Sequence, residues 1–377
     1  MKSLSVYIHI PFCAKKCNYC DFLSAPATAE KRKQYLAALK SEMQAEAKRY
    51  EDFCVKSVFF GGGTPSILEA QAITELLDVL KTAYHMDTQA EITLEMNPAT
   101  ATKEKMESWK KAGINRLSIG LQSAHDEELK MLGRIHCYAD FLESYQNARE
   151  VGFTNVNIDL MSGLPGQDRK KWEDTLQKVL ALKPEHISAY SLIIEEGTEI
   201  CQNIERYPAL PSEEEDRKMY QRTKEILKEN GFTRYEISNY AKEGYECKHN
   251  CVYWQRGNYV GFGLGAASMV ENVRWTNTRD FDRYLANCRQ PFMLQEEKEV
   301  LSERDCMEEF MFLGLRMMQG VKKADFTRNF SKSMEEVYGD VIAKWEAQQM
   351  LYQDESHVWL SEQGIDVSNV IFSDFLA

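Results

Sequence analysis

The sequence is short of basic residues and has no long apolar run. It carries 46 Lys and Arg against 58 Asp and Glu, which gives a formal net charge of -12. A protein that wraps a phosphate backbone needs clustered Lys and Arg, so we expect no nucleic acid partner. No apolar run approaches the length that spans a bilayer. The first such run, LSVYIHIPF, is interrupted by His9 and Pro11 and lacks the small-residue cleavage site of a signal peptide. We therefore expect a cytoplasmic protein without a transmembrane segment.

In the cytoplasm the cysteines of this chain are expected to be mostly reduced. The chain has 10 cysteines in 377 residues, and in the cytoplasm closely spaced cysteines indicate metal binding and not disulfides. Five of them stand alone and are expected to be plain thiols: Cys54, Cys137, Cys201, Cys288 and Cys306. The length is sufficient for one large domain and a small one.

Short β-rich runs alternate with longer amphipathic runs over the first two hundred residues. The strands are expected at 5–10, 57–62, 91–96, 116–122, 156–165 and 186–194, with helices near 30–50, 69–84 and 102–112. Six strand-helix units predict an α/β fold with a parallel sheet, either open or curled into a partial barrel. Functional residues then belong at the carboxyl ends of the strands.

The alternation of β-rich and amphipathic runs ends after about residue 200. A charged helix is expected at 212–230, followed by an irregular stretch rich in aromatic residues and glycine at 235–275. The segment 300–377 has the pattern of two helices and a β-like run, which is similar to a small winged-helix module. It shows too few basic residues for a module that reads DNA.

Three cysteines, Cys13, Cys17 and Cys20, follow the first predicted strand as C-x3-C-x2-C. Thiolates at this spacing on one loop can face one centre, and three of them leave a four-iron cubane with one open iron. A structural zinc site would need a fourth ligand nearby, and no second C-x2-C follows. The triplet therefore predicts a 4Fe-4S cluster whose open iron binds a substrate or cofactor.

The second predicted strand ends in Gly61, Gly62, Gly63 and Thr64. Three glycines carry an entropic cost and pack no side chain, so they are useful where the backbone must approach a ligand closely. The alternative is a flexible turn between a strand and a helix.

The cysteine spacing together with GGGTPS resembles the radical S-adenosylmethionine enzymes. The resemblance covers nearly the whole chain and is closest to the coproporphyrinogen oxidase-like branch, which belongs to porphyrin biosynthesis. It implies S-adenosylmethionine on the open iron and a partial (β/α)6-type barrel over 1–290, with a heme-associated region near 235–275. It also implies a HemN-type C-terminal domain over 291–377.

The resemblance also implies a set of cofactor contacts. A tyrosine contacts the cofactor near the cluster, the Gly-Gly-Thr backbone holds its amino group, and four polar side chains hold its other polar parts. The matching residues are Tyr7, Tyr19, Gly62, Gly63, Thr64, Glu95, Gln122, Arg134 and Asp159. A sulfonium compound with ammonium and carboxylate groups needs acidic and basic partners as well as backbone donors. Without the resemblance, we would interpret Arg134 as a solvated helix residue and Asp159 as a helix or turn cap. His9 and His136 are expected to be structural.

Three features distinguish this chain within the branch. Phe22 stands where the oxygen-independent coproporphyrinogen III oxidases usually have a fourth cysteine, and only six residues precede Tyr7, where those enzymes carry an extension. In addition, KHNCVYWQ contains His249, Asn250, Tyr253 and Trp254, which resemble the H-N-x-x-Y-W signature of a heme chaperone family. Imidazole is a common axial ligand of heme iron, and aromatic rings pack on porphyrins. The resemblance implies that this chain binds heme near His249 and passes it to an unidentified acceptor protein.

Three alternatives stay open. The chain could be a true radical enzyme that decarboxylates a porphyrinogen propionate, as an oxygen-independent coproporphyrinogen III oxidase does. His249 could be a core or capping histidine, or Cys247, His249 and Cys251 could bind zinc as C-x-H-x-C. Nearby, the glycines of NYVGFGLGAASM are expected to serve tight packing, because neither the context nor a following acidic residue fits a phosphate loop.

Overall fold

Six parallel strands form the centre of the fold in this computed structural model, which describes residues 1–376. Each strand pairs in parallel with the next one along the chain. They are β1 (Lys2–Ile10), β2 (Phe53–Gly62), β3 (His85–Met96), β4 (Arg116–Gln122), β5 (Val156–Ser162) and β6 (His186–Ser191). The predicted α/β fold with a parallel sheet is confirmed.

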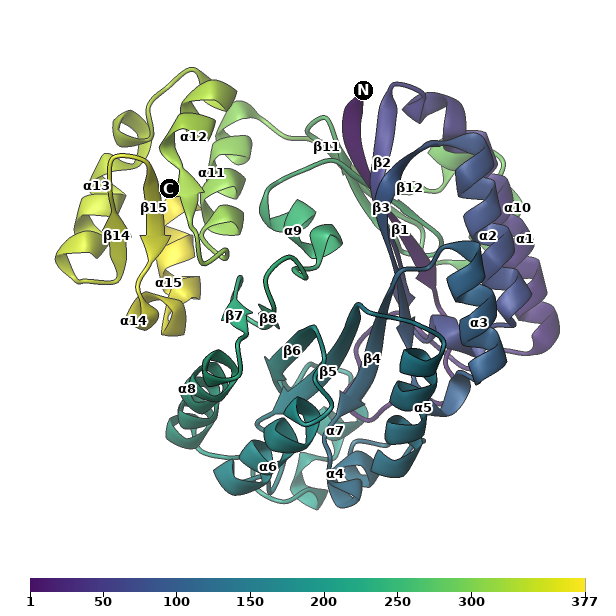
Figure 1. Cartoon of the computed structure of the whole chain (residues 1–377). Coiled ribbons are helices and arrows are strands. Elements are labelled where there is room, and N and C mark those ends of the chain that lie inside the picture. Colours follow the sequence, from purple (N-terminus) through teal and green to yellow (C-terminus); the bar gives the residue numbers. More distant parts are fainter. Residues whose placement is uncertain (377) are drawn as a thin grey trace.

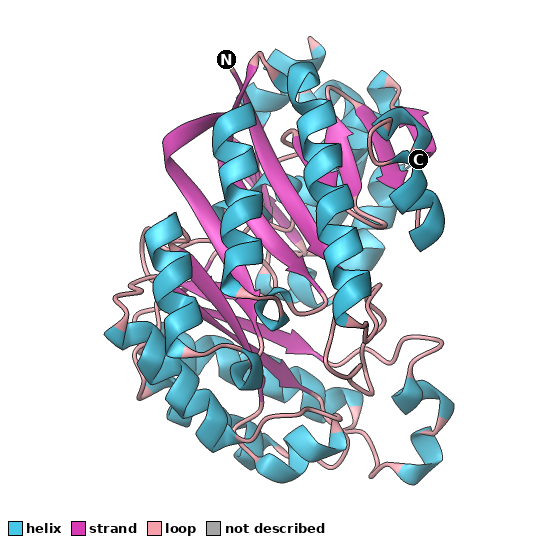
Figure 2. Ribbon diagram, turned by 90° about the vertical axis from the view of Figure 1, so that its right-hand side faces the viewer, coloured by secondary structure: helices cyan, strands magenta, loops and turns pink. Residues whose placement is uncertain are grey.

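Helices cover one face of this sheet (Figure 2). They are α1 (Ala29–Glu46), α2 (Ala70–Ala83), α3 (Lys103–Ala112), α4 (Asp126–Met131), α5 (Tyr138–Glu150), α6 (Arg169–Leu180) and α8 (Glu213–Glu229). Local sequence sets their ends: at α3, the Thr102 side chain accepts a hydrogen bond from the Lys105 N–H, and Gly113 ends the helix with a φ of 106°. Met106 and Trp109 of α3 are buried, which joins this helix to the main hydrophobic core.

Further strands extend the sheet at both edges. At one edge β9 (Tyr259–Phe262) is parallel to β1, and β10 (Ala267–Val270), β11 (Val273–Asn277) and β12 (Gln295–Val300) follow in antiparallel pairs. At the other edge lie β8 (Asn239–Ala241) and β7 (Thr233–Arg234). The full order is β12-β11-β10-β9-β1-β2-β3-β4-β5-β6-β8-β7, so the sheet curves around without closing (Figure 1).

The expectation of an irregular stretch at 235–275 is wrong. It contains β8 to β11 and the short helix α9 (Lys248–Trp254). These strands are too short to show a clear alternation of polar and apolar residues, and glycines interrupt them. The packing role of those glycines is confirmed at Gly261, where a Cβ atom would collide with the backbone of Ala267.

The C-terminal module has its own hydrophobic core, which runs from Leu301 to Phe375. It consists of α11 (Glu303–Gly314), β13 (Val321–Lys322), α12 (Lys323–Phe330), α13 (Met334–Ala347), β14 (Leu351–Gln353) and β15 (His357–Leu360), followed by α14 (Glu362–Asp366) and α15 (Ser368–Ser373). Its small sheet has the order β13-β15-β14. Helix, strand, helix, helix, strand, strand is the succession of a winged-helix module. The domain boundary at residue 290 stays a prediction, and β12 still pairs within the large sheet.

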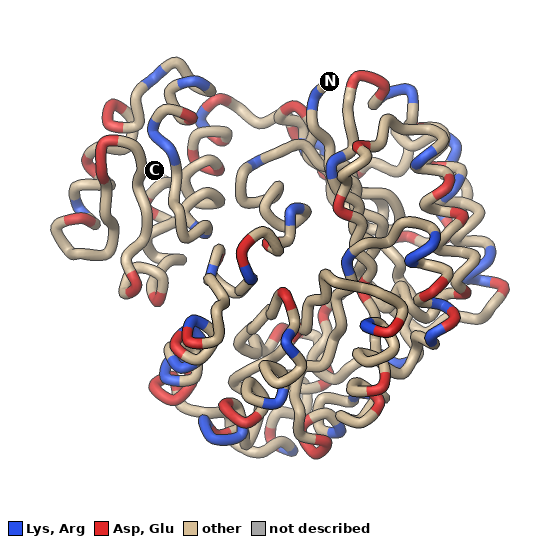
Figure 3. Tube along the Cα trace, in the orientation of Figure 1, with Lys and Arg blue, Asp and Glu red and all other residues tan. Residues whose placement is uncertain are grey.

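Acidic and basic residues are interspersed along the outer helices (Figure 3). Lys40 of α1 and Glu75 of α2, for example, form an ion pair of 2.7 Å between neighbouring helices. Within residues 1–376, no helix is both long enough and apolar enough to cross a bilayer.

Candidate cofactor site

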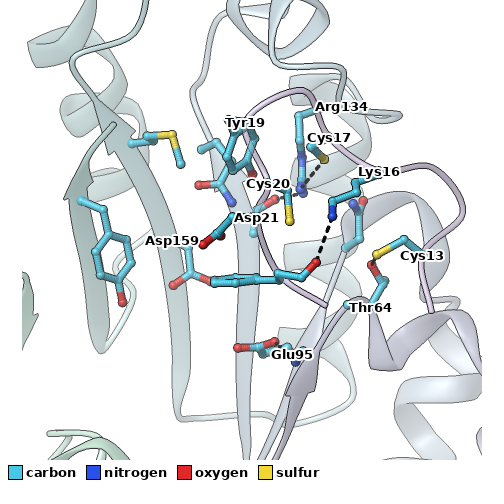
Figure 4. Close-up of a pocket in the computed structure, with 18 of the residues that line it drawn as sticks. Cys13, Lys16, Cys17, Tyr19, Cys20, Asp21, Thr64, Glu95, Arg134 and Asp159 are labelled. Carbon is cyan, nitrogen blue, oxygen red and sulfur yellow. Dashed lines mark hydrogen bonds between the residues drawn. The ribbon is translucent and has the colours of Figure 1, made fainter. Parts of the chain in front are cut away.

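A pocket of ≈ 480 Å³ opens at the carboxyl ends of the parallel strands. The sequence predicted functional residues at this edge, and most of the predicted residues line this pocket (Figure 4). The expected residues that line the pocket are Cys13, Cys17, Tyr19, Cys20, Gly62, Gly63, Thr64, Glu95, Gln122, Arg134 and Asp159. Two expected residues, Tyr7 and His249, lie elsewhere.

The cysteine loop is fastened to the end of β1. The Cys13 N–H donates to the Ala25 carbonyl at 3.2 Å, and the Ala25 N–H donates to the Pro11 carbonyl at 3.0 Å. A ring nitrogen of His9 lies 2.9 Å from the Leu23 carbonyl oxygen. These bonds hold both ends of the loop, so the expected structural role of His9 is confirmed.

Two side chains donate hydrogen bonds to the cysteine sulfurs. Thr64 Oγ1 lies 3.4 Å from Cys13 Sγ, and Arg134 Nη1 lies 3.6 Å from Cys17 Sγ (Figure 4). Such bonds stabilise a thiolate, which is the form of cysteine that ligates iron. Burial raises the pKa of the Cys20 thiol, so this thiol is held protonated until a positive centre replaces its proton.

The three cysteine thiols fit an iron-sulfur cluster better than a single metal ion. Among residues 1–376, no three Cys, His, Asp or Glu side chains lie close enough together to hold one metal ion, which argues against zinc at the triplet. A cubane binds each thiolate through a different iron, so its thiols must surround a cavity and need not meet at a point. Cys13, Cys17 and Cys20 are free thiols that line one pocket, and they therefore suit a 4Fe-4S cluster.

The glycines at the end of β2 allow a close approach of this strand to the cysteine loop. A Cβ atom on Gly63 would lie 2.7 Å from the Phe12 carbonyl oxygen and 3.0 Å from Cys13 Sγ. The Gly63 N–H donates to the Ile10 carbonyl and the Thr64 N–H to the Phe12 carbonyl, both at 2.8 Å. The alternative of a flexible turn does not fit this arrangement, because the segment is fixed on both sides.

Two carboxyl groups face the same space from β3 and β5 (Figure 4). Burial, with the Asp159 charge as the second cause, raises the pKa of Glu95 to about 8. Burial also raises the pKa of Asp159, although Ser118 and Asn157 donate hydrogen bonds to its oxygens at 3.0 and 2.7 Å. A cation in this pocket would therefore be attracted by groups that become ionised as it binds.

The sequence analysis missed Ser118 and Asn157. A signal was available, because residues at i and i+2 of a strand point to the same side, and Asn157 stands two positions before Asp159. Asp159 lies inside β5 and its carboxylate is held by these neighbours. It does not cap a helix or a turn.

Arg134 and Gln122 complete the wall of the pocket. Arg134 lies in the loop between α4 and α5, and its Nη2 donates to the Gly120 carbonyl at 2.6 Å. Gln122 has a φ of 73° beside a bulge in the pairing of β4 with β5, which turns the end of β4 toward the pocket. Burial raises the pKa of Tyr19, and the neighbouring Arg134 opposes that shift.

Tyr7 and His249 line a second, inner cavity of ≈ 170 Å³. The phenolic oxygen of Tyr7 lies 3.0 Å from His9 Nδ1. His249 is 1% exposed; its Nδ1 lies 2.9 Å from Ser57 Oγ and its Nε2 lies 2.9 Å from the Tyr253 hydroxyl. Burial lowers the pKa of His249 to about 3, so the ring is neutral and both its nitrogens are engaged.

The zinc alternative at Cys247, His249 and Cys251 is wrong for the described residues, where no such cluster is found. Cys247 precedes α9, and His249 and Cys251 lie within it. Residues two apart on a helix point in different directions. Burial raises the pKa of both Cys247 and Cys251 to about 12, which disfavours the thiolates that zinc requires.

His136 is also buried, and burial lowers its pKa to about 4.

Comparison with known proteins agrees with this geometry. The model of the radical SAM superfamily matches residues 7–179, and that of the HemN C-terminal domain matches residues 301–367. The heme chaperone HemW of Bacillus subtilis is 36% identical over 99% of both chains. The heme chaperone HemW of Escherichia coli is 33% identical over 99% of this chain and 98% of its own length.

A solved structure shows the same fold. The coproporphyrinogen III oxidase HemN of Escherichia coli superposes with a TM-score of 0.87 over 99% of this chain and 90% of its own. Its sequence identity with this chain is 23%, so the likeness concerns the fold alone.

Proposed function

Because the chain belongs to the HemW family within the radical SAM superfamily, we propose that it is a heme chaperone. It carries a 4Fe-4S cluster with S-adenosylmethionine, binds heme, and passes the heme to an acceptor protein. The observation that carries the cofactor part of this proposal is the ring of three free thiols around one pocket that also holds two carboxyl groups.

Different residues of the pocket would hold the cluster and the S-adenosylmethionine. Cys13, Cys17 and Cys20 would hold three irons, and the fourth iron would bind the amino and carboxylate groups of S-adenosylmethionine. Glu95 and Asp159 would attract the cationic cofactor, while Arg134 and Gln122 would hold its polar parts. When bound, the cluster and the cofactor supply either a regulatory state or a radical, and the residues of this chain bind and orient them.

Heme binding is assigned to the region of His249 by the H-N-x-x-Y-W signature. In the structure this residue is buried with both nitrogens hydrogen-bonded, and the cavity beside it is too small for a tetrapyrrole. Ligation of heme iron by His249 therefore requires α9 to move and at least one of the two hydrogen bonds to break. Such a movement would couple heme binding to the inner wall of the barrel.

The alternative function is oxidative decarboxylation of coproporphyrinogen III by a radical mechanism. It would use the same pocket, so the cysteine triplet does not distinguish the two functions. Phe22, which stands in the place of the fourth cysteine of those oxidases, is 63% exposed at the mouth of the pocket. Family membership favours the chaperone.

Location and partners follow from this proposal. A cluster with an open iron requires a reducing compartment, so we place the protein in the cytoplasm. The acceptor is a heme protein, and no nucleic acid takes part.

The test is an anaerobic heme titration of the reconstituted protein, followed by transfer of the bound heme to apomyoglobin. We expect saturation near one heme per chain and a shift of the Soret band when apomyoglobin is added. Coproporphyrinogen III is incubated in parallel with S-adenosylmethionine and a reductant. Substrate-dependent release of carbon dioxide without heme binding would refute the chaperone proposal and establish the oxidase.

A further inference from the structure

The inside of the barrel is polar where comparable barrels are apolar. The lumen of a (β/α)8 barrel is usually filled by bulky branched side chains. Here the inward positions of four neighbouring strands are Glu91 and Glu95, Arg116 and Ser118, Asn157 and Asp159, and His186 and Ser188. Buried polar groups cost stability unless they are paired. Most of these groups pair with one another, so a ligand is suggested only where one of them lacks a partner.

An inner chamber of ≈ 170 Å³ lies within this lumen. It shares Glu95, Ser118, Asp159 and Tyr190 with the cofactor pocket, and His249, Asn250 and Tyr253 of α9 close its other side. A water needs about 10–15 Å³ of such space, so the chamber has room for a small organic acid. Pockets for drug-sized ligands measure roughly 300–1,000 Å³, which excludes a whole tetrapyrrole.

Arg116 lines this chamber without a partner. It is 2% exposed, its Nε atom is buried without a hydrogen bond, and no hydrogen bond or ion pair joins its guanidinium to another of residues 1–376. A guanidinium offers five N–H donors in a fixed fork. Leaving such a cation buried and unpaired is costly.

The carboxylates near Arg116 have other donors. Ser118 and Asn157 donate to Asp159, and the Gly62 N–H donates to Glu95 at 3.2 Å. Glu91 accepts the backbone N–H groups of Lys248 and His249 at 3.2 and 3.1 Å. Glu91 and Asp159 attract Arg116 through space, but neither accepts a hydrogen bond from its N–H groups.

We propose that the inner chamber binds a carboxylate group, whose two oxygens accept the paired N–H groups of Arg116. Arginine matches a carboxylate in this bidentate way. The carboxylate belongs either to a free small acid or to a propionate arm of heme, because His249, where heme binding is proposed, lines the same chamber. This inference goes beyond the proposed function, and its first test is independent of heme.

The first test uses the reconstituted protein with sodium formate, acetate and propionate, followed by calorimetry. We expect saturable binding that is at least tenfold weaker in Arg116→Met and intermediate in Arg116→Lys, since lysine keeps the charge but loses the fork. Arg283→Met is the matched control, because Arg283 pairs with Glu296 at the surface. Should Arg116→Met not fold, wild-type crystals soaked with and without sodium propionate decide: difference density for the carboxylate is expected beside Arg116.

The second test asks whether the carboxylate belongs to a larger molecule. It compares heme with heme dimethyl ester, whose propionates are masked, and it rests on the proposed heme binding. If a propionate reaches the chamber, esterification weakens binding at least tenfold in the wild type and has little effect in Arg116→Met.

The outcomes separate the two proposals. Binding of a free acid that depends on Arg116 supports the chamber and identifies its ligand as a small molecule. An ester effect that depends on Arg116, without free acid binding, supports an arm of the larger ligand. No acid binding together with equal ester effects in both proteins overturns the chamber proposal. If the wild-type protein binds no heme, the chaperone proposal is refuted. The calorimetry with small acids then tests the chamber proposal by itself.

Discussion

Nε2 of His249 lies 2.9 Å from the hydroxyl oxygen of Tyr253, its neighbour one turn along α9. Both residues belong to the H-N-x-x-Y-W signature. On the other side of the ring, Ser57 of β2 holds Nδ1. The signature therefore fixes α9 against the barrel wall, and any role of His249 in heme binding must compete with these bonds.

We predict that Tyr253→Phe strengthens heme binding by about 2- to 12-fold, the equivalent of one hydrogen bond of roughly 1 ± 0.5 kcal/mol. The substitution frees Nε2 and keeps the ring. The measurement is the Soret titration, with Tyr352→Phe as the control because Tyr352 is 44% exposed in the C-terminal module. Unchanged affinity in Tyr253→Phe and in His249→Ala would remove His249 from the heme site.

The cluster assignment predicts that Cys17→Ser prevents assembly of the 4Fe-4S cluster. Serine lacks the thiolate that ligates iron, and its oxygen replaces the sulfur to which Arg134 donates a hydrogen bond. After anaerobic reconstitution, the broad visible absorbance and the acid-labile sulfide should be lost. Cys54→Ser, a substitution at the opposite end of β2, should keep both. A full cluster in Cys17→Ser would contradict the assignment.

Glu95 should make S-adenosylmethionine binding depend on pH. Its pKa is raised to about 8, so below that pH the carboxyl is mostly protonated and does not attract a cation. Affinity should rise about tenfold between about pH 7 and pH 9. Because the amino group of the ligand also titrates near this range, the comparison is with Glu95→Gln, measured by equilibrium dialysis. Parallel pH profiles of the two proteins would refute the role of Glu95.

The sequence alone was sufficient for the parallel sheet and for most of the cofactor pocket. In the sequence, six short β-rich runs alternate with longer amphipathic runs, which identifies the strands. The cysteines, glycines and acidic residues stand at the carboxyl ends of these strands. This rule places side chains in one pocket without knowledge of their contacts. The roles of Glu95 and Asp159 came from the family resemblance, and the rule brings their side chains together because strand ends of a parallel sheet meet at one edge.

Contacts between distant segments could not be predicted in this way. The partner of His249 is Ser57, which is 192 positions away, and no local pattern connects them. Arg116 stands at the start of a strand and looks like an ordinary surface charge in the sequence. Only the curvature of the sheet, together with the position of α9, encloses it. The short strands β7 to β11 were missed because two to five residues show no period.

A last prediction concerns Glu42 of α1, which links this helix to the distant edge of the sheet. The carboxyl is 2% exposed and accepts hydrogen bonds from the Gly263 N–H at 2.9 Å and from Asn277 Nδ2 at 2.6 Å, with Tyr284 as a third donor. Burial, opposed by these three bonds, raises the pKa of Glu42 to about 7 from a usual value of 4.5. The folded state therefore favours the protonated form.

The sign of the pH effect follows from that shift. A raised pKa in the folded state means that the stability contribution is complete below about pH 4.5 and is lost as the pH rises through 7. At about 1.4 kcal/mol per unit, the loss is of the order of 3 kcal/mol. Glu42→Gln has no charge to develop, so its melting temperature should fall less than that of the wild type between about pH 5 and pH 8. It should nevertheless be lower than the wild type at pH 5, because the glutamine amide faces three donors. Melting curves that shift equally with pH would show that Glu42 does not ionise in this range.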